Sequence, residues 1–143
     1  MKKYLNIGAL AIAALVLAAC GTTKPAEEAK GQPGKQIATQ TSGDLTVTLQ
    51  NEAGELVMGQ NRFIVSFRKA DGQPVDAGKV TVSSSMAMPG MAPMVAPIEL
   101  QSAGQVGAYS LTGDFAMSGA WKFEIRWDGP AGQGTTSFST NVR

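Results

Sequence analysis

The chain has 143 residues, a formal charge of +1, one cysteine and no histidine. A near-neutral chain with scattered charges lacks the basic footprint of a nucleic-acid-binding protein. The absence of histidine removes the commonest general base and the commonest metal ligand, and a single cysteine excludes an internal disulfide. With no phosphate loop, nucleotide fingerprint or calcium loop either, we do not expect an enzyme.

The first residues are typical of a secretory signal peptide. Lys2 and Lys3 precede an apolar run from Ile7 to Ala19, which is shorter than the roughly 20 residues of a membrane span. The run ends Leu17-Ala18-Ala19-Cys20-Gly21, which resembles a bacterial lipobox. An ordinary signal peptide that ends near a cysteine is the alternative. We expect cleavage before Cys20 and acylation of its thiol, because this only cysteine lies at the cleavage point.

A lipidated Cys20 predicts an extracytoplasmic protein of the cell envelope, since two or more acyl chains hold a protein stably on a membrane without a transmembrane helix. Cleavage removes residues 1–19 with two lysines, leaving ten basic residues against eleven acidic ones. Residues 20–43 are rich in Gly, Pro and charged side chains, and we interpret them as the lipidated cysteine and a flexible linker. The remaining residues, 44–143, have the length of one domain.

From residue 44 onward the apolar pattern has a period of two. In the clearest run, Trp121, Phe123, Ile125 and Trp127 alternate with charged residues, as in a half-buried strand. Similar runs separated by Gly, Pro and Asp turns predict an all-β fold, an immunoglobulin-like antiparallel β-sandwich of about seven strands. A small closed barrel is the alternative. We expect both tryptophans to pack in the core and Tyr109 to be a structural residue.

A methionine-rich segment at residues 86–94 interrupts this pattern. Pro89-Gly90 suits the centre of a type II turn, because proline presets φ and glycine accepts a positive φ. Such a turn would fold the later methionines back toward the earlier ones. The segment holds four of the seven methionines of the chain, namely Met86, Met88, Met91 and Met94.

The segment has two interpretations. Thioethers are soft, neutral donors that suit monovalent copper, and they escape the disulfide formation that threatens thiols outside the cytoplasm. Three or four converging sulfurs would therefore make a Cu(I) site. Alternatively, Val80, Val82 and Met86 share one parity, so the methionines would continue the core face of a strand or form an adaptable protein contact.

Several short motifs resemble the YtkA-like and FixH-like family of extracytoplasmic domains. The resemblance spans roughly Leu45 to Trp127 and includes the methionine-proline segment. The motifs that carry it are Asp71-Gly72-Gln73-Pro74-Val75, Ala77-Gly78-Lys79-Val80, Gly107-Ala108-Tyr109 and Met117-Ser118-Gly119-Ala120-Trp121.

This resemblance implies an immunoglobulin-like sandwich associated with copper handling, heavy-metal efflux or oxidase assembly. It implicates Met86, Met88 and Met91, with Met117 as a contributor from a neighbouring strand. Many relatives place a histidine near this segment, and its absence here argues against divalent copper. The resulting hypothesis is a membrane-tethered Cu(I)-binding protein with an efflux or oxidase-assembly partner. The alternative is an interaction or structural envelope module that uses the methionine loop as an apolar contact.

Overall fold

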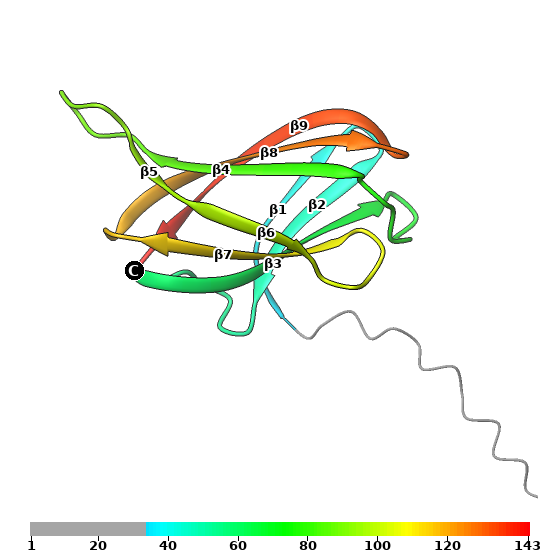
Figure 1. Cartoon of the computed structure of the whole chain (residues 1–143), viewed down its shortest axis with the longest axis horizontal. Helices are drawn as coiled ribbons and strands as arrows, with labels where there is room; N and C mark the ends of the chain where they lie inside the picture. The colour runs from blue at the N-terminus through cyan, green and yellow to red at the C-terminus, as the bar shows by residue number, and fades with distance from the viewer. Residues whose placement is uncertain (1–33) are drawn as a thin grey trace, which may run out of the picture. The chain divides into compact units, whose positions relative to one another are not determined.

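The structure is a computed structural model that describes residues 34–143, and it contains nine β-strands within that range (Figure 1). None of the described residues lies in a helix that could span a membrane. Cys20 and the signal peptide lie outside the described residues. The strands are β1 (Lys35–Ser42), β2 (Leu45–Asn51), β3 (Gly59–Lys69), β4 (Lys79–Met86), β5 (Met94–Ala96), β6 (Ile98–Ser102), β7 (Ala108–Phe115), β8 (Gly119–Gly129) and β9 (Gly132–Val142).

The strands form two antiparallel sheets, which confirms the predicted β-sandwich. One sheet has the order β1-β2-β3-β7-β6 and the other the order β5-β4-β8-β9. The alternation of apolar and charged residues in β8 shows why the two sheets pack face to face. Trp121, Phe123 and Ile125 are fully buried and Trp127 is 5% exposed, whereas the charged residues between them face outward. Burying the apolar side of each sheet against the other is the main favourable contribution to this fold.

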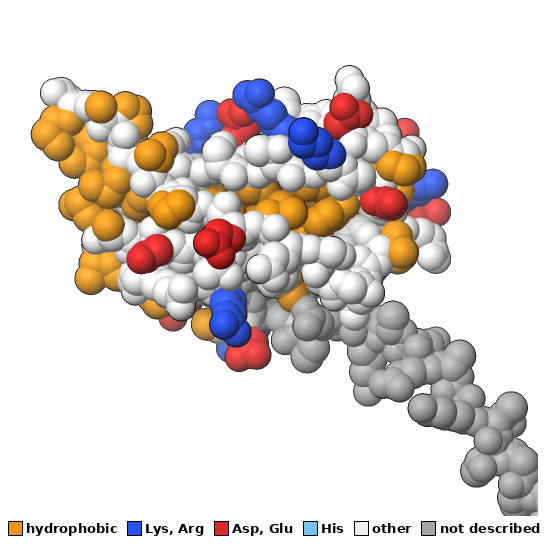
Figure 2. Space-filling model, viewed as in Figure 1, with side chains coloured by type: hydrophobic (Ala, Val, Ile, Leu, Met, Phe, Trp, Pro, Cys, Tyr) orange, Lys and Arg blue, Asp and Glu red, His pale blue; other side chains and the backbone are white. Residues whose placement is uncertain are grey.

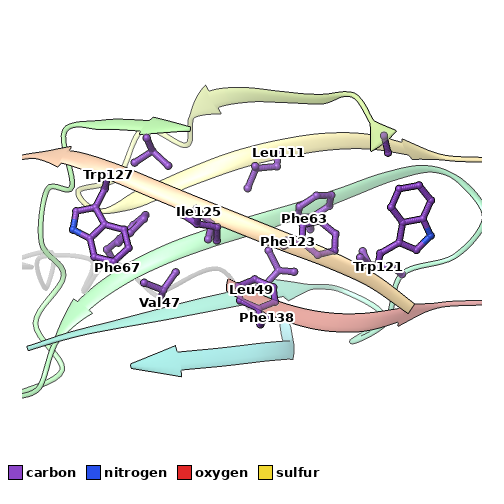
Figure 3. Close-up of a cluster of buried hydrophobic side chains, with 14 of the residues drawn as sticks. Val47, Leu49, Phe63, Phe67, Leu111, Trp121, Phe123, Ile125, Trp127 and Phe138 are labelled. Carbon is purple, nitrogen blue, oxygen red and sulfur yellow. The ribbon is translucent and has the colours of Figure 1, made fainter. Parts of the chain in front are cut away.

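Aromatic rings run along the core from one end of the sandwich to the other (Figure 3). Trp121 meets Phe115 at one end, with ring centroids 5.1 Å apart, and Trp127 meets Phe67 at the other, at 5.6 Å. Phe63 and Phe123 make an edge-to-face contact between them. Both tryptophans therefore pack in the core, as the strand pattern predicted.

The predicted linker boundary was wrong. Residues 35–42, assigned to the linker, form β1 and pair along their length with β2. β1 has one large apolar residue, Ile37, because it is an edge strand held by backbone pairing and by polar contacts such as Thr39 Oγ1 to Thr48 Oγ1 at 2.8 Å. Hydrophobic alternation therefore did not reveal it. The short β5 and the neighbouring β6 were also missed.

We call one end of the sandwich the methionine end. It comprises residues 52–58, 86–94 and 116–118, together with Arg143. Gly119 is the partner of Val142 in β9, and Gly59 is the partner of Phe115 in β7. The Met58 amide donates to the Arg143 carbonyl at 2.6 Å. Together with the pairing of Ser85 in β4 with Lys122 in β8, these pairings bring three loops that are far apart in sequence to the same end.

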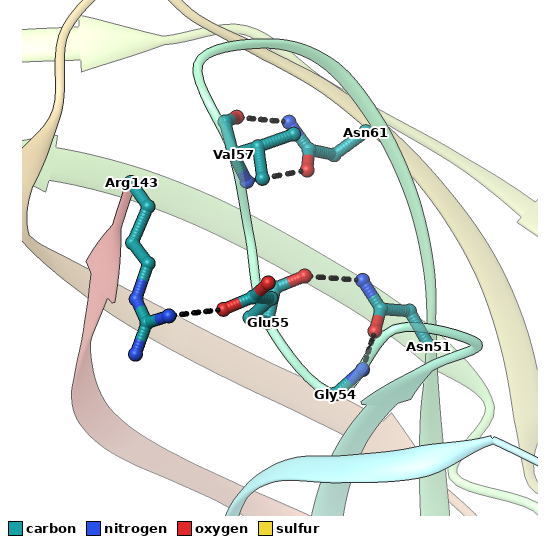
Figure 4. Close-up of polar contacts among 6 residues, drawn as sticks. All are labelled: Asn51, Gly54, Glu55, Val57, Asn61 and Arg143. Carbon is teal, nitrogen blue, oxygen red and sulfur yellow. Dashed lines mark hydrogen bonds and ion pairs between the residues drawn. The ribbon is translucent and has the colours of Figure 1, made fainter.

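Polar contacts order the loop between β2 and β3 at this end (Figure 4). The buried Asn61 side chain accepts from the Val57 amide at 2.9 Å and donates to the Val57 carbonyl at 2.6 Å. Arg143 pairs with Glu55 at 3.0 Å, which joins the loop to the end of β9. The buried Asn61 amide is thus satisfied through both its oxygen and its nitrogen, and these bonds stabilise the loop.

At the opposite end, Tyr109 connects β7 to the segment before β4. Its hydroxyl donates to the Gly78 carbonyl at 3.0 Å and lies 3.4 Å from Asp76 Oδ1. Tyr109 is therefore a structural residue, as predicted. Burial, and then the charge and hydrogen bond of Asp76, raise the pKa of Tyr109 above 10.0, because each disfavours the phenolate.

This raised pKa predicts a loss of stability in alkali. The neutral phenol is favoured in the folded state, so its contribution is complete below the unfolded pKa of about 10 and is lost as the pH rises through the folded pKa. We expect the free energy of unfolding to fall above about pH 10, and to fall less in Tyr109→Phe. Denaturant titrations of both proteins at several pH values would test this. Tyrosinate absorbance would report Tyr109 alone, because the only other tyrosine is Tyr4 in the predicted signal peptide. Equal alkaline slopes in both proteins would contradict the assignment.

Candidate metal centre

Met86 and Met94 form a cross-strand pair where β4 and β5 begin to separate. Side chains of directly opposed residues lie on the same face, with Cβ atoms about 4.5–5.5 Å apart. That face is the inner one, since Met86 is 8% exposed and Met94 packs against the core, whereas Val95 beside it is 71% exposed. Two thioethers are therefore held together at the rim of the core.

Met117, another of the predicted ligands, lies in the loop between β7 and β8. A Cβ atom added to Gly119 would lie 2.9 Å from Met86 Sδ, so the Met86 sulfur lies directly over Gly119. Met117 lies two residues earlier, and its carbonyl accepts a hydrogen bond from Trp121 Nε1 at 3.0 Å. The fold thus brings the Met117 loop next to Met86 and anchors it through a core tryptophan.

The loop between β4 and β5 contains the predicted turn. The Met91 amide donates to the Met88 carbonyl at 3.2 Å, and Gly90 has a φ of 73°, as the third position of a type II turn requires. Met88 is half-buried and packs against the core. Met91 is 65% exposed, so the turn leaves its side chain at the tip of the hairpin rather than against the pair below.

Met58 also lies at the methionine end, and the sequence analysis did not identify it. It is isolated in its loop and has no characteristic spacing to another methionine. Only its backbone bond to Arg143 and the pairing of Gly59 with Phe115 place it there. All six methionines after Met1 therefore gather at one end of the sandwich.

Both interpretations of the methionines find support in this geometry. Met86 fills the core, and Met88 and Met94 pack against it, as the core-filling interpretation expects. The same three residues lie at the methionine end with the more exposed Met117, and thioethers are donors that suit Cu(I). Within residues 34–143, no group of three or more His, Cys, Asp or Glu side chains is arranged to hold a metal ion.

A surface depression of about 540 Å³ lies on the outer face of the five-stranded sheet and reaches Glu52 and Ala53 at the methionine end. Arg62, Ile64 and Ser110 help to line it, and none of its lining residues is a methionine. It is partly open to solvent. We therefore give it no role in the candidate centre.

Comparison with a solved structure supports the fold. A DUF4426 family protein from Pseudomonas aeruginosa PAO1 is similar, with a TM-score of 0.51 and 20% identity over 73% of this chain and 96% of that one. The Lin-41 filamin domain gives a TM-score of 0.45 and 14% identity over 62% of this chain and 81% of that one. No curated protein matches the chain. A family model described as YtkA-like matches residues 39–126, more than half of the sequence, and the chain therefore belongs to the YtkA-like family.

Proposed function

We propose that this protein binds Cu(I) through thioethers at the methionine end. The observation that carries the proposal is the gathering of six methionines at one end of the sandwich, with Met86 and Met94 paired across two strands. Met117 and Met88 are the further ligands we propose. Met91, which the sequence analysis included among the ligands, is exposed at the tip of the hairpin and is left out of the proposed ligand set.

The chemistry of the donors suits an exported protein. Thioether sulfur needs no deprotonation before it binds a metal, unlike a thiol or an imidazolium. It also forms no disulfide in an oxidising compartment. A site made of methionine would therefore hold Cu(I) where a cysteine site would be oxidised, and its affinity would vary little with pH.

The tether and the partner belong to the same proposal. We propose that Cys20 is lipidated after removal of residues 1–19, which would keep the domain beside a membrane outside the cytoplasm. The resemblance to FixH-like domains supports an efflux or oxidase-assembly complex of the same membrane as the partner. The proposal includes no catalytic step.

The test is a competition titration of the metal-free protein with Cu(I) against a chromogenic chelator, under reducing and oxygen-free conditions. We expect stoichiometric binding and an affinity that is constant from about pH 5 to 8, the range in which histidine would titrate. Competition measured at each pH, with the chelator's own pH dependence subtracted, checks both expectations. Absence of competition at every pH would refute the copper proposal.

A second candidate function is a contact module without metal. The burial of Met86 and the packing of Met88 and Met94 favour it, because they give these side chains a structural reason to be present. Partner capture with and without Cu(I) distinguishes the two functions. A contact module captures its partner equally well with and without Cu(I), whereas a copper carrier does so only when loaded or only when empty.

A further inference from the structure

The hairpin that contains the methionine segment has an unusual surface. From Met86 to Ile98 the chain carries no polar or charged side chain. We call residues 86–98 the apolar hairpin. It projects beyond the body of the sandwich, and hydrophobic atoms cover it in the space-filling view (Figures 1 and 2). Met91 at its tip is 65% exposed and Val95 is 71% exposed.

Three prolines remove backbone donors from the apolar hairpin. Pro89, Pro93 and Pro97 have no N–H group. The Met91 amide is bonded to the Met88 carbonyl within the turn, and β5 pairs with β4. Each N–H group that is absent or bonded lowers the cost of bringing the tip into contact with lipid, because an unsatisfied backbone group there costs several kcal/mol.

The position of the hairpin relative to the start of the described chain allows it to reach a membrane. Lys35 pairs with Asn51, and Gly54 lies against the Lys35 side chain, so β1 begins beside the loop of the methionine end. Cys20 precedes Gly34 by fourteen residues. At about 3.4 Å per residue they span at most roughly 48 Å, which keeps the domain within reach of a lipidated Cys20.

We propose that the tip of the apolar hairpin inserts into the surface of the membrane to which Cys20 tethers the domain. This inference rests on the lipid anchor of the proposed function and not on copper. Exposed Met91, Ala92, Pro93 and Val95 would enter the boundary between headgroups and acyl chains, where interfacial segments lie about 5–10 Å deep. The contact would fix the orientation of the sandwich and place the methionine pair at the lipid surface.

The test uses the lipidated full-length protein with one added cysteine, since acylated Cys20 does not react with a thiol probe. Ala92→Cys places an environment-sensitive NBD label at the tip. Val106→Cys places the same label on another exposed apolar site, in the loop between β6 and β7 at the opposite end of the sandwich. Each protein is reconstituted without metal into vesicles of equal parts phosphatidylethanolamine and phosphatidylglycerol. Flotation measures the anchor, while the NBD emission and its quenching by brominated lipid measure insertion.

We expect both proteins to float, and only the label at position 92 to shift to the blue and be quenched by brominated lipid. Adding Met91→Asp should abolish that shift, whereas Val106→Asp in the Ala92→Cys protein should not. Two floating proteins with equally aqueous labels would overturn the insertion and leave the anchor standing. Failure of both proteins to float would overturn the anchor and the insertion together, with the copper titration unaffected. A blue-shifted label at position 92 without vesicles would overturn the proposal in favour of a protein contact at the tip.

Discussion

Replacing Met86 and Met94 together by leucine is expected to weaken Cu(I) binding at least ~100-fold and to leave the sandwich folded. Leucine has nearly the volume of methionine, so a Met-to-Leu change in a core usually costs less than about 1.5 kcal/mol. It removes the sulfur, however. Loss of a group that merely supports a metal ligand already costs about 10–100-fold in affinity, and this variant loses two proposed ligands.

The design separates the two interpretations of the methionine end because leucine keeps the packing and removes only the donor. Serine substitutions would not separate the two interpretations. Met86 is buried, so a serine hydroxyl at its position would destabilise the core as well as remove the sulfur. The matched control is Met58→Leu, at the same end but outside the proposed ligand set. Competition titrations of the three proteins give the result. An affinity in the double variant equal to that of the parent would assign Met86 and Met94 to core packing alone.

Trp121→Ala is expected to lower the free energy of unfolding by about 3–5 kcal/mol, the usual cost of truncating a buried large aromatic residue. Trp121 is fully buried, its ring lies 5.1 Å from that of Phe115, and its Nε1 donates to the Met117 carbonyl. Alanine would leave a cavity at the methionine end and release the Met117 loop. Urea titration followed by circular dichroism measures the change, with Val95→Ala on the exposed face of β5 as the control.

Trp121→Phe distinguishes the contribution of the aromatic ring to the free energy of unfolding from that of the hydrogen bond to Met117. Phenylalanine keeps an aromatic ring against Phe115 but loses the donor to Met117, so much of the stability should remain. The released carbonyl should still loosen the Met117 loop and weaken Cu(I) binding if Met117 is a ligand. A stability loss near zero for Trp121→Ala would show that Trp121 is not a central residue of the core.

The strongly alternating strands were predictable from the sequence. β8 has four large apolar residues at every second position, and each is buried because a two-sheet fold offers one buried face to each strand. The turn at Pro89 and Gly90 was predictable for a local reason, since its backbone angles depend on those two residues. β1 was not, because an edge strand is held by backbone pairing that leaves no hydrophobic pattern.

The sequence by itself determined that the chain is an all-β domain without histidine or an internal disulfide, and that methionine is its chief soft donor. These properties depend on composition and on local periodicity. Only the tertiary structure decided which methionines meet. Three features depend on strand register between distant segments. These are the pairing of Met86 with Met94, the position of Met86 Sδ over Gly119, and the position of Met58 at the methionine end. Strand register is set by the packing of the two sheets and by the pairing of strand ends. A local sequence pattern predicts neither.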